Sequence, residues 1–369
     1  LVDEFFCDGS GTCSSTPATR PCTPYVCDGK TSTCAAECGG NTGCVATSVC
    51  DRSQAHKTGV GECISPSKVA LVGNIKDLQD EVSMQSLGTT TRTHIRLSKG
   101  TYSFDFKWSG SVKLNIVGDA GTLFKPAPGS TEPAIVYVQD GADVTLQGIS
   151  FTGSLANQSG LACQTMSSGL AWLTIIECDV SNNSNFGVTT NRCDVVARRN
   201  KISANGSGGV RITNGSGTMT NNLIISNGQK GGGSAGGVEL IPGSGKSIHF
   251  SNNTLVDNIY PSNAAVSGML CQGVLTVLPN NIIFSNATQN TKVLATGCNF
   301  ANSLVPQGGG KNGNFSKLAQ LDASYKPKIS LSPCIDAGQA TTATVIDVEG
   351  NPRPAIKNGK VDVGCYEVK

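Results

Sequence analysis

Five charged residues that are expected to face outward are the candidates for acid–base chemistry. The leading catalytic candidates are Arg198, Arg211 and Glu239, and Lys201 and Asp257 accompany them. A cation that neutralises a uronate carboxylate, next to a base that takes the neighbouring proton, would suit an elimination reaction. However, Arg211 and Glu239 occupy equivalent positions in two successive copies of a repeat that is described below, so they should be neighbours on adjacent strands. A cross-strand ion pair of this kind is ordinary sheet stabilisation. We therefore favour the ion pair over a saccharide groove.

Carboxylates for glycoside hydrolysis would have to cluster in twos or threes. The closest approximation is Asp179 and Asp194, with Glu177 nearby, but no "NTD…DD…HG" series of the polygalacturonase kind occurs. His249 is expected to face outward from its strand, where a lone surface histidine is more often inert than catalytic. The chain thus lacks a recognisable catalytic set.

Two further stretches invite a ligand and are better explained as turns. "PGSGKS" at 242–247 has Leu240 where a phosphate loop needs glycine, and a strand rather than a helix follows it. Turns such as "CDVSNNSN" could offer oxygens to Ca²⁺, but the spacing of known calcium loops is absent. We predict no metal site and no cofactor, with Ca²⁺ kept as the alternative.

These residues are positioned by a repeat that asparagine pairs mark. The second Asn of each pair is Asn222, Asn253 or Asn281, and the same frame extends back to Asn200 and Cys178. The intervals along this frame from Cys178 are 22, 22, 31 and 28 residues. Five residues after each of these stand Asn183, Asn205, Asn227, Asn258 and Asn286. A fixed frame of this kind indicates a stacked repeat.

Short strands separated by turns, three per copy, predict an all-β fold: a right-handed parallel β-helix, or solenoid, with coils about 4.8 Å apart. Asn tolerates a left-handed backbone, and its amide can donate to the next coil's carbonyl while accepting from the coil before. We therefore predict an Asn ladder through the set ending in Asn286. Residues 75–87, "IKDLQDEVSMQSL", form the one convincing amphipathic helix, expected to cap the first open edge of the stack.

Composition excludes some partners and indicates a compartment. The net charge is +2 with no basic run, so neither nucleic acid nor an anionic membrane is an expected partner. No apolar run approaches the roughly 18 residues of a membrane span. Sixteen Cys indicate an oxidising compartment, hence a secreted, extracellular or outer cell-surface location. Because the chain begins at Leu1, we expect that a signal peptide or further N-terminal sequence has been removed.

The cysteines divide the chain. Nine lie between Cys7 and Cys63 with few large apolar residues around them, and we favour disulfides over zinc there. The other seven cysteines lie beyond Cys63. Because nine and seven are both odd numbers, either one disulfide joins the two parts of the chain or each part keeps a free thiol. The favoured local pairs are Cys271 with Cys298 and Cys334 with Cys365, although spacing alone does not determine connectivity.

The resulting division has four parts. We predict a small disulfide-rich module at 1–66, a linker and capping helix at 67–90, the β-helix at 91–330 and a β-helix end or cap at 331–369.

From about residue 70 onward the chain resembles secreted bacterial parallel β-helix repeat proteins. The resemblance rests on "IRLSKGTY" after the helix, the "NxIxxN" coils, and the block "SPCIDAG", "DVEGNPR" and "VDVGCYE" at 332–367. That block is similar to the ending of surface-attached β-helix proteins of the choice-of-anchor and polymorphic outer-membrane type. The Cys-rich leader resembles modules on secreted proteins of predatory soil myxobacteria. The resemblance implies the fold and export, and no single activity, because lyases, hydrolases, adhesins and spike-like proteins share this scaffold.

Together these observations predict a secreted or cell-surface β-helix with a structural or adhesive role, which presents a flat face to a glycan or a cell-surface protein. Two alternatives stay open. One is a polysaccharide lyase acting on uronate-containing glycans, and the other is self-assembly as the subunit of an extracellular filament.

Overall fold

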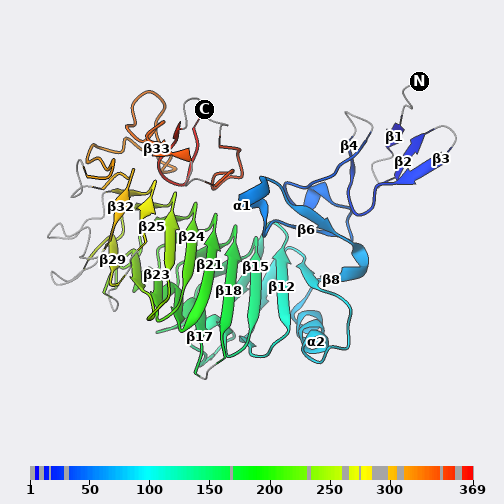
Figure 1. The fold of residues 1–369 in the computed structure, drawn as a ribbon. Helices are drawn as coiled ribbons and strands as arrows, with labels where there is room; N and C mark the ends of the chain where they lie inside the picture. Colours follow the sequence, from blue (N-terminus) through cyan, green and yellow to red (C-terminus); the bar gives the residue numbers. More distant parts are fainter. Residues whose placement is uncertain are drawn as a thin grey trace.

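The computed structural model shows a stack of β-coils with one module attached near each end (Figure 1). The predicted all-β parallel β-helix is thereby confirmed. The structure describes residues 5–7, 12–15, 18–28, 33–166, 169–230, 234–259, 266–273, 276–284, 298–305, 311–340, 344–353 and 360–368.

Each coil contributes one strand to each of three parallel sheets, which we number in the order the chain visits them. The first sheet holds β8 (Val69–Val72), β9 (His94–Leu97), β12 (Lys113–Gly118), β15 (Asp143–Gln147), β18 (Ala171–Ile176), β21 (Cys193–Arg198), β24 (Gly217–Thr220) and β27 (Ile248–Ser251). The second sheet holds β10 (Gly100–Ser103), β13 (Thr122–Lys125), β16 (Ser150–Thr152), β19 (Asp179–Ser181), β22 (Lys201–Ser203), β25 (Leu223–Ile225), β28 (Thr254–Val256) and β31 (Ile282–Phe284). The third sheet holds β11 (Phe106–Trp108), β14 (Ala134–Val138), β17 (Ser159–Gln164), β20 (Phe186–Asn191), β23 (Gly208–Thr213), β26 (Val238–Ile241) and β29 (Met269–Cys271).

Alternation along each strand builds the core. In the first sheet, inward Leu173 and Ile175 pair with Val195 and Ala197 in the next coil, and all four are buried. Tyr102, Phe124 and Phe151 stack in consecutive coils of the second sheet, with ring centroids 5.7 and 5.4 Å apart. Each coil alone would expose its inward face, so burial depends on the neighbouring coils.

The first corner, where the chain passes from the first sheet to the second, turns on one residue with a left-handed backbone. Glu177, Arg199, Asn221, Asn252 and Asn280 hold this position, with φ between 54° and 58°. The second corner, between the second and third sheets, uses Asn182, Ala204, Ser226 and Asp257 in the same way. The residue that follows in each case is the ladder residue, so the expectation that ladder Asn themselves are left-handed is wrong. Their side chains point inward, and the residue before them makes the turn.

Two ladders of buried Asn side chains run along these corners. In the second corner, the backbone N–H and Nδ2 of Asn205 both donate to Oδ1 of Asn227, at 3.0 and 2.9 Å, and Nδ2 also donates to the carbonyl of Val180 in the preceding coil. Asn183 and Asn258 continue this ladder, whereas Asn286 lies outside the described residues. In the first corner, Asn200, Asn222, Asn253 and Asn281 are linked equivalently, and Cys178 joins them only through its backbone N–H, which donates to Oδ1 of Asn200. Nδ2 therefore bonds the backbone carbonyl of the coil before and the side-chain carbonyl of the coil after.

Replacing Asn227 by Ala removes a member from the middle of the ladder. The two donors of Asn205 and the carbonyl of Ile202 lose their partner while staying buried, so we expect the free energy of unfolding to fall by about 3 kcal/mol. Denaturant titration measures this. Asn185→Ala, which removes one exposed bond to Asn157, serves as control, and equal losses in the two variants would contradict the ladder's role.

Helix α2 (Ile75–Ser86) covers the N-terminal end of the stack. In Figure 1 it lies below the disulfide-rich N-terminal module, which we call the head. Asn74 caps it by accepting from the backbone N–H of Asp77, and the fully buried Leu78 joins the main core. Leu87, the last residue of the predicted helix, is instead the residue that caps its C-terminal end and is 73% exposed.

The head contains β1 (Phe5–Cys7), β2 (Thr12–Ser15), β3 (Ala18–Pro21), β4 (Cys27–Asp28), β5 (Thr33–Cys34), β6 (Val49–Asp51), α1 (Ala55–Thr58) and β7 (Glu62–Ile64), with short 3₁₀ turns at Asn41–Gly43 and Pro66–Lys68. Disulfides join Cys22 to Cys34, Cys38 to Cys50 and Cys44 to Cys63. Val49 and Ile64 pack on Val69 and Val117, which belong to the outer face of the first sheet.

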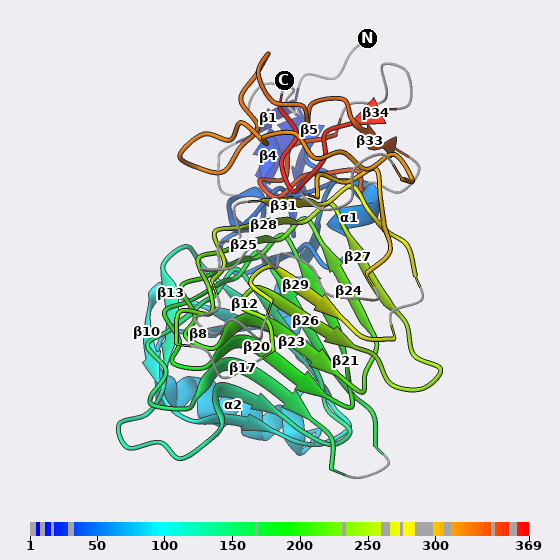
Figure 2. The ribbon, with the colours of Figure 1, turned by 90° about the vertical axis from the view of Figure 1, so that its left-hand side faces the viewer.

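The C-terminal block, described at residues 311–340, 344–353 and 360–368, lies on the side of the β-helix, over its last coils (Figure 2). It follows the small strand pair β30 (Leu278–Pro279) and β32 (Phe300–Ala301), and its own strands are β33 (Gly338–Gln339) and β34 (Lys360–Val361). Outward residues of the second sheet change from Lys201 and Ser203 to Leu223 and Ile225 where the block begins to cover them. A second apolar core follows, with the outward side chains of β25, β28 and β31 on one side and Val363, Cys365 and Tyr366 on the other.

Two disulfides brace the β-helix itself. One joins Cys163 on β17 to Cys193 on β21, and the other joins Cys271 on β29 to Cys298, just before β32. Cys163 and Cys271 occupy the same column of the third sheet. The pair Cys271–Cys298 is the one favoured from the sequence.

The predicted bridge between Cys334 and Cys365 is wrong, because both are buried free thiols. A backbone bond pairs Cys334 with Val363 instead, and the two thiols find different hydroxyl partners, Ser332 and Thr254. Burial raises the pKa of each thiol to about 12. Cys178 is a third buried free thiol among the described residues.

Alkylation tests this assignment. We expect iodoacetamide, without reductant, to label Cys334 and Cys365 only after the chain is unfolded, because both thiols are buried and protonated in the native state. Peptide mapping reads the result, with Cys271 and Cys298 as the internal control that reacts only after reduction. A peptide in which Cys334 is cross-linked to Cys365 would contradict the structure.

Candidate functional site

Arg198 and the first corner form a junction with the head rather than a groove. Arg198 is the last outward residue of β21, and its Nη1 donates to the carbonyl of Ser53 at 3.1 Å. Burial, and secondarily the neighbouring Arg199, lowers the pKa of Arg198 to about 10. Gln147, in the same outward column, accepts from the N–H of Arg52 and donates to the carbonyl of Cys50.

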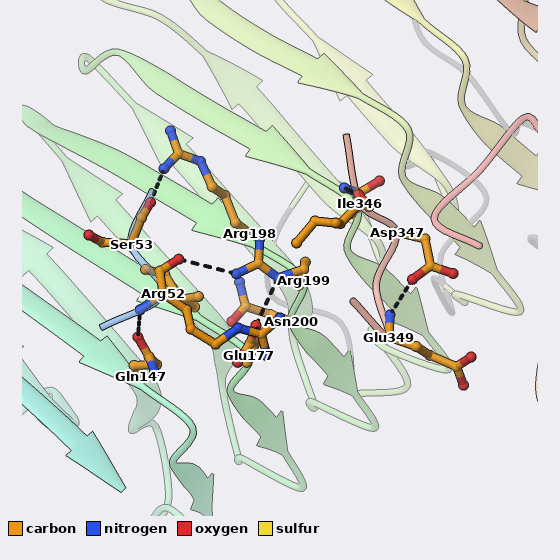
Figure 3. Close-up of polar contacts among 12 residues, drawn as sticks. Arg52, Ser53, Gln147, Glu177, Arg198, Arg199, Asn200, Ile346, Asp347 and Glu349 are labelled. Atoms are coloured by element: carbon orange, nitrogen blue, oxygen red, sulfur yellow. Dashed lines mark hydrogen bonds and ion pairs between the residues drawn. The ribbon is translucent and has the colours of Figure 1, made fainter. Parts of the chain in front are cut away.

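Glu177 neutralises two arginines at this junction (Figure 3). Its Oε1 lies 2.9 Å from Nη1 of Arg52 and 2.9 Å from Nε of Arg199, whose side chain is only 1% exposed. Burial lowers the pKa of Arg199, while Glu177 acts in the opposite direction. This cluster attaches the head to the coils and leaves none of the three groups free for a substrate.

The same corner attaches the C-terminal block further along. Asn221 donates to the carbonyl of Ile346 and accepts from Arg353, which forms a buried ion pair with Glu367 at 2.7 Å. Asn280 accepts from the backbone N–H of Gln339. The left-handed residues of the first corner therefore serve as docking points for both modules.

Removal of Glu177 should show how strongly the head depends on this cluster. Glu177→Ala leaves Arg52 and Arg199 with neighbouring positive charge and little water, so we expect a loss of about 3 kcal/mol in the free energy of unfolding. Chemical denaturation provides the measurement. Glu132→Ala, which breaks the half-exposed contact with Lys107 at 3.8 Å, should cost under about 1 kcal/mol, and a similarly small loss for Glu177→Ala would contradict the account.

Arg211 and Glu239 are adjacent on β23 and β26, as their column requires. Nε of Arg211 lies 3.4 Å from Oε2 of Glu239, and the guanidinium lies over the ring of Phe186 at 5.7 Å. The Glu239 side chain is 1% exposed and that of Arg211 is 39% exposed, so only the arginine of the pair reaches solvent. The contact is the ion pair that the sequence favours, and a catalytic role for either residue stays a prediction.

The remaining candidate carboxylates are dispersed. Asp194 lies on the first sheet, 3.5 Å from Lys246, and Asp179 lies on the second sheet beside Lys201. Glu177 stands at the corner between these sheets, engaged with arginines. The structure therefore does not assemble them as a hydrolytic cluster.

Sulfur atoms in the head come closest to a metal-binding arrangement among the described residues. One sulfur each of Cys38, Cys44 and Cys50 lies within 4.8 Å of the others. All three are in disulfides, so they offer no thiolate to a metal. The Ca²⁺ alternative stays a prediction.

The outer face of the first sheet is the surface that the sequence analysis passed over. Trp172 points outward from β18 with 43% of its surface exposed. In the adjacent coils the same column holds Asp143 and Asp194, one on each side of the tryptophan. The register of Leu173 and Ile175 as inward residues already implied that Trp172 faces outward.

Polar residues extend this face beside the tryptophan. The next outward column contains Thr145, Thr174, Val196, Thr218 and the exposed His249. The column beyond it lies under the head, where Val117 and Ile176 are buried. The head thus covers one margin of the sheet and leaves a strip of hydroxyls, carboxylates and one indole at least partly exposed. We call Asp143, Trp172, Thr174, Asp194 and Thr218 the Trp172 face; Thr145, in the same column as Thr174, is buried.

Comparison with known proteins bears on the fold. Residues 132–305 match the family described as "Right handed beta helix region". The fold is a right-handed β-helix. No curated protein matches the chain, and no helix among the described residues is long and apolar enough to cross a membrane.

Among solved structures, the chain is similar to the tailspike protein gp49 from Acinetobacter baumannii bacteriophage Fri1, described as a capsular polysaccharide depolymerase. The sequence identity is 10% and the TM-score 0.31. The match covers 66% of this chain and 60% of the tailspike, so the chain spans less than two thirds of that protein. Likeness at this level is no evidence of a shared activity.

Proposed function

We propose that this protein is an extracellular glycan-binding β-helix whose binding surface is the Trp172 face. The observation that carries the proposal is an exposed indole between two carboxylates on a flat parallel sheet. An indole offers a broad apolar plane for the C–H face of a sugar ring. Carboxylate oxygens on either side, about one strand spacing away, can accept hydrogen bonds from sugar hydroxyls.

The charged residues of the Trp172 face determine which class of glycan we expect it to bind. Asp143 and Asp194 each have a lysine within 4 Å, Lys113 at 3.7 Å and Lys246 at 3.5 Å, so the face is close to neutral overall. The carboxylates are nevertheless nearest to the indole in the sheet register, and they would repel a uronate carboxylate placed over it. Neutral hexose or pentose chains are therefore the proposed ligands.

Support for the alternatives is weaker. A uronate lyase would need a cation available to substrate, and Arg211 is engaged by Glu239 and Phe186. Unsaturated products released from a uronate polysaccharide by the intact chain, and lost in Arg211→Ala, would favour the lyase. The disulfides of the head and coils support the extracellular location that the proposal includes.

A glycan array tests the binding proposal. We expect the intact chain to bind neutral polysaccharides and Trp172→Ala to bind at least tenfold more weakly, because the stacking plane is lost. Val277→Ala, which truncates an apolar residue that is 49% exposed, is the matched control and should bind normally. Binding that survives Trp172→Ala unchanged would overturn the proposal.

A further inference from the structure

A separate cavity lies between the second sheet and the C-terminal block. Its volume is about 300 Å³, at the lower end of small-ligand sites. Val256, Asp257 and Phe284 line it from the coils, and the block contributes Leu318, Gln320, Leu321, Asp322 and Tyr325. It is therefore an open pocket lined by five apolar or aromatic side chains, one amide and two carboxylates.

Asp257 is not required there by the fold. It holds the left-handed position of the second corner, with φ 54°, where other coils use Asn182, Ala204 or Ser226. Among the residues that the structure describes, no hydrogen-bond or ion-pair partner reaches its carboxylate. Burial raises the pKa of Asp257, which is the expected effect on a carboxylate that lacks a nearby cation.

Asp322 lies across the cavity in a tight turn that presents Tyr325. Its Oδ1 accepts the backbone N–H of Ser324 at 2.8 Å and that of Lys326 at 2.9 Å. The nearby Lys326 is already engaged, with Nζ 2.6 Å from Glu349 and over the ring of Tyr366. Lys326 is thus directed to another acid.

We propose that this cavity binds an organic ammonium group on a short apolar stem, such as the end of a lysine side chain from another protein. Asp257 would pair with the cation, Phe284 and Tyr325 would offer ring faces to it, and Val256 and Leu321 would contact the methylenes. Cations bind favourably over aromatic faces within about 6 Å. An amino sugar is the alternative source of the ammonium group, because Gln320 and Asp322 can also pair with ring hydroxyls.

Calorimetric titration of the full chain with n-butylammonium tests the proposal, with n-butanol and butyrate as matched probes at constant ionic strength. We expect butylammonium to bind at least tenfold more tightly than either. Glucosamine probes the alternative source, and tighter binding of glucosamine than of butylammonium would contradict an alkyl stem.

Asp257→Asn is the decisive variant, because Asn182 already occupies an equivalent corner and the fold accepts it. We expect it to weaken butylammonium binding at least tenfold while thermal unfolding stays cooperative. Asp179→Asn, on the same sheet but outside the cavity, should bind as the intact chain does. Unchanged binding by Asp257→Asn, or equal binding of butanol, would overturn the proposal. Neither result depends on the Trp172 face, so the two proposals fail separately.

Discussion

The structure depends on how each coil turns its corners while its backbone stays buried. A corner reduced to one left-handed residue places the next residue inside the stack, where its backbone N–H needs an acceptor. An inward Asn side chain in the following coil supplies that acceptor, and its own Nδ2 bonds the coil before. Because an unpaired buried donor or acceptor costs about 1–3 kcal/mol, this geometry strongly favours Asn at successive corners. The chain accordingly repeats it from coil to coil.

The inward side chains are used for core packing and for the Asn ladders. The coils therefore differ mainly in their outward side chains. Outward residues of the second sheet are polar at Ser181 and Ser203 and apolar at Ile225, Val256 and Phe284, where the C-terminal block covers them. At the first corner, the left-handed position carries Glu, Arg or Asn, and the chain uses it for attachment through Glu177, Arg199 and Asn221. The modules cover these surfaces and leave the Trp172 face exposed.

The repeat explains which features can be predicted from the sequence. The 22-residue interval predicts the fold, the inward columns and the Arg211–Glu239 contact, because stacking converts equal frame positions into neighbours. It does not predict which chain segment covers which outward column. The roles of Arg198 and Glu177 depend on contacts with residues about 145 and 125 positions away, and no local pattern encodes these. The Cys334–Cys365 pairing was wrong for a related reason: proximity in a block does not determine which thiol faces which partner.

The central functional claim concerns one of only two tryptophans in the chain. Trp108 is buried, and its Nε1 donates to the carbonyl of Val112, whereas Trp172 is exposed on the proposed face. The two indole N–H signals in a ¹H–¹⁵N spectrum therefore report on the core and the face separately. During titration with neutral cello-, xylo-, manno- and malto-oligosaccharides, the account predicts that at least one series shifts the Trp172 signal and leaves that of Trp108 in place. If no series moves the Trp172 signal, or if binding moves only that of Trp108, the account is contradicted.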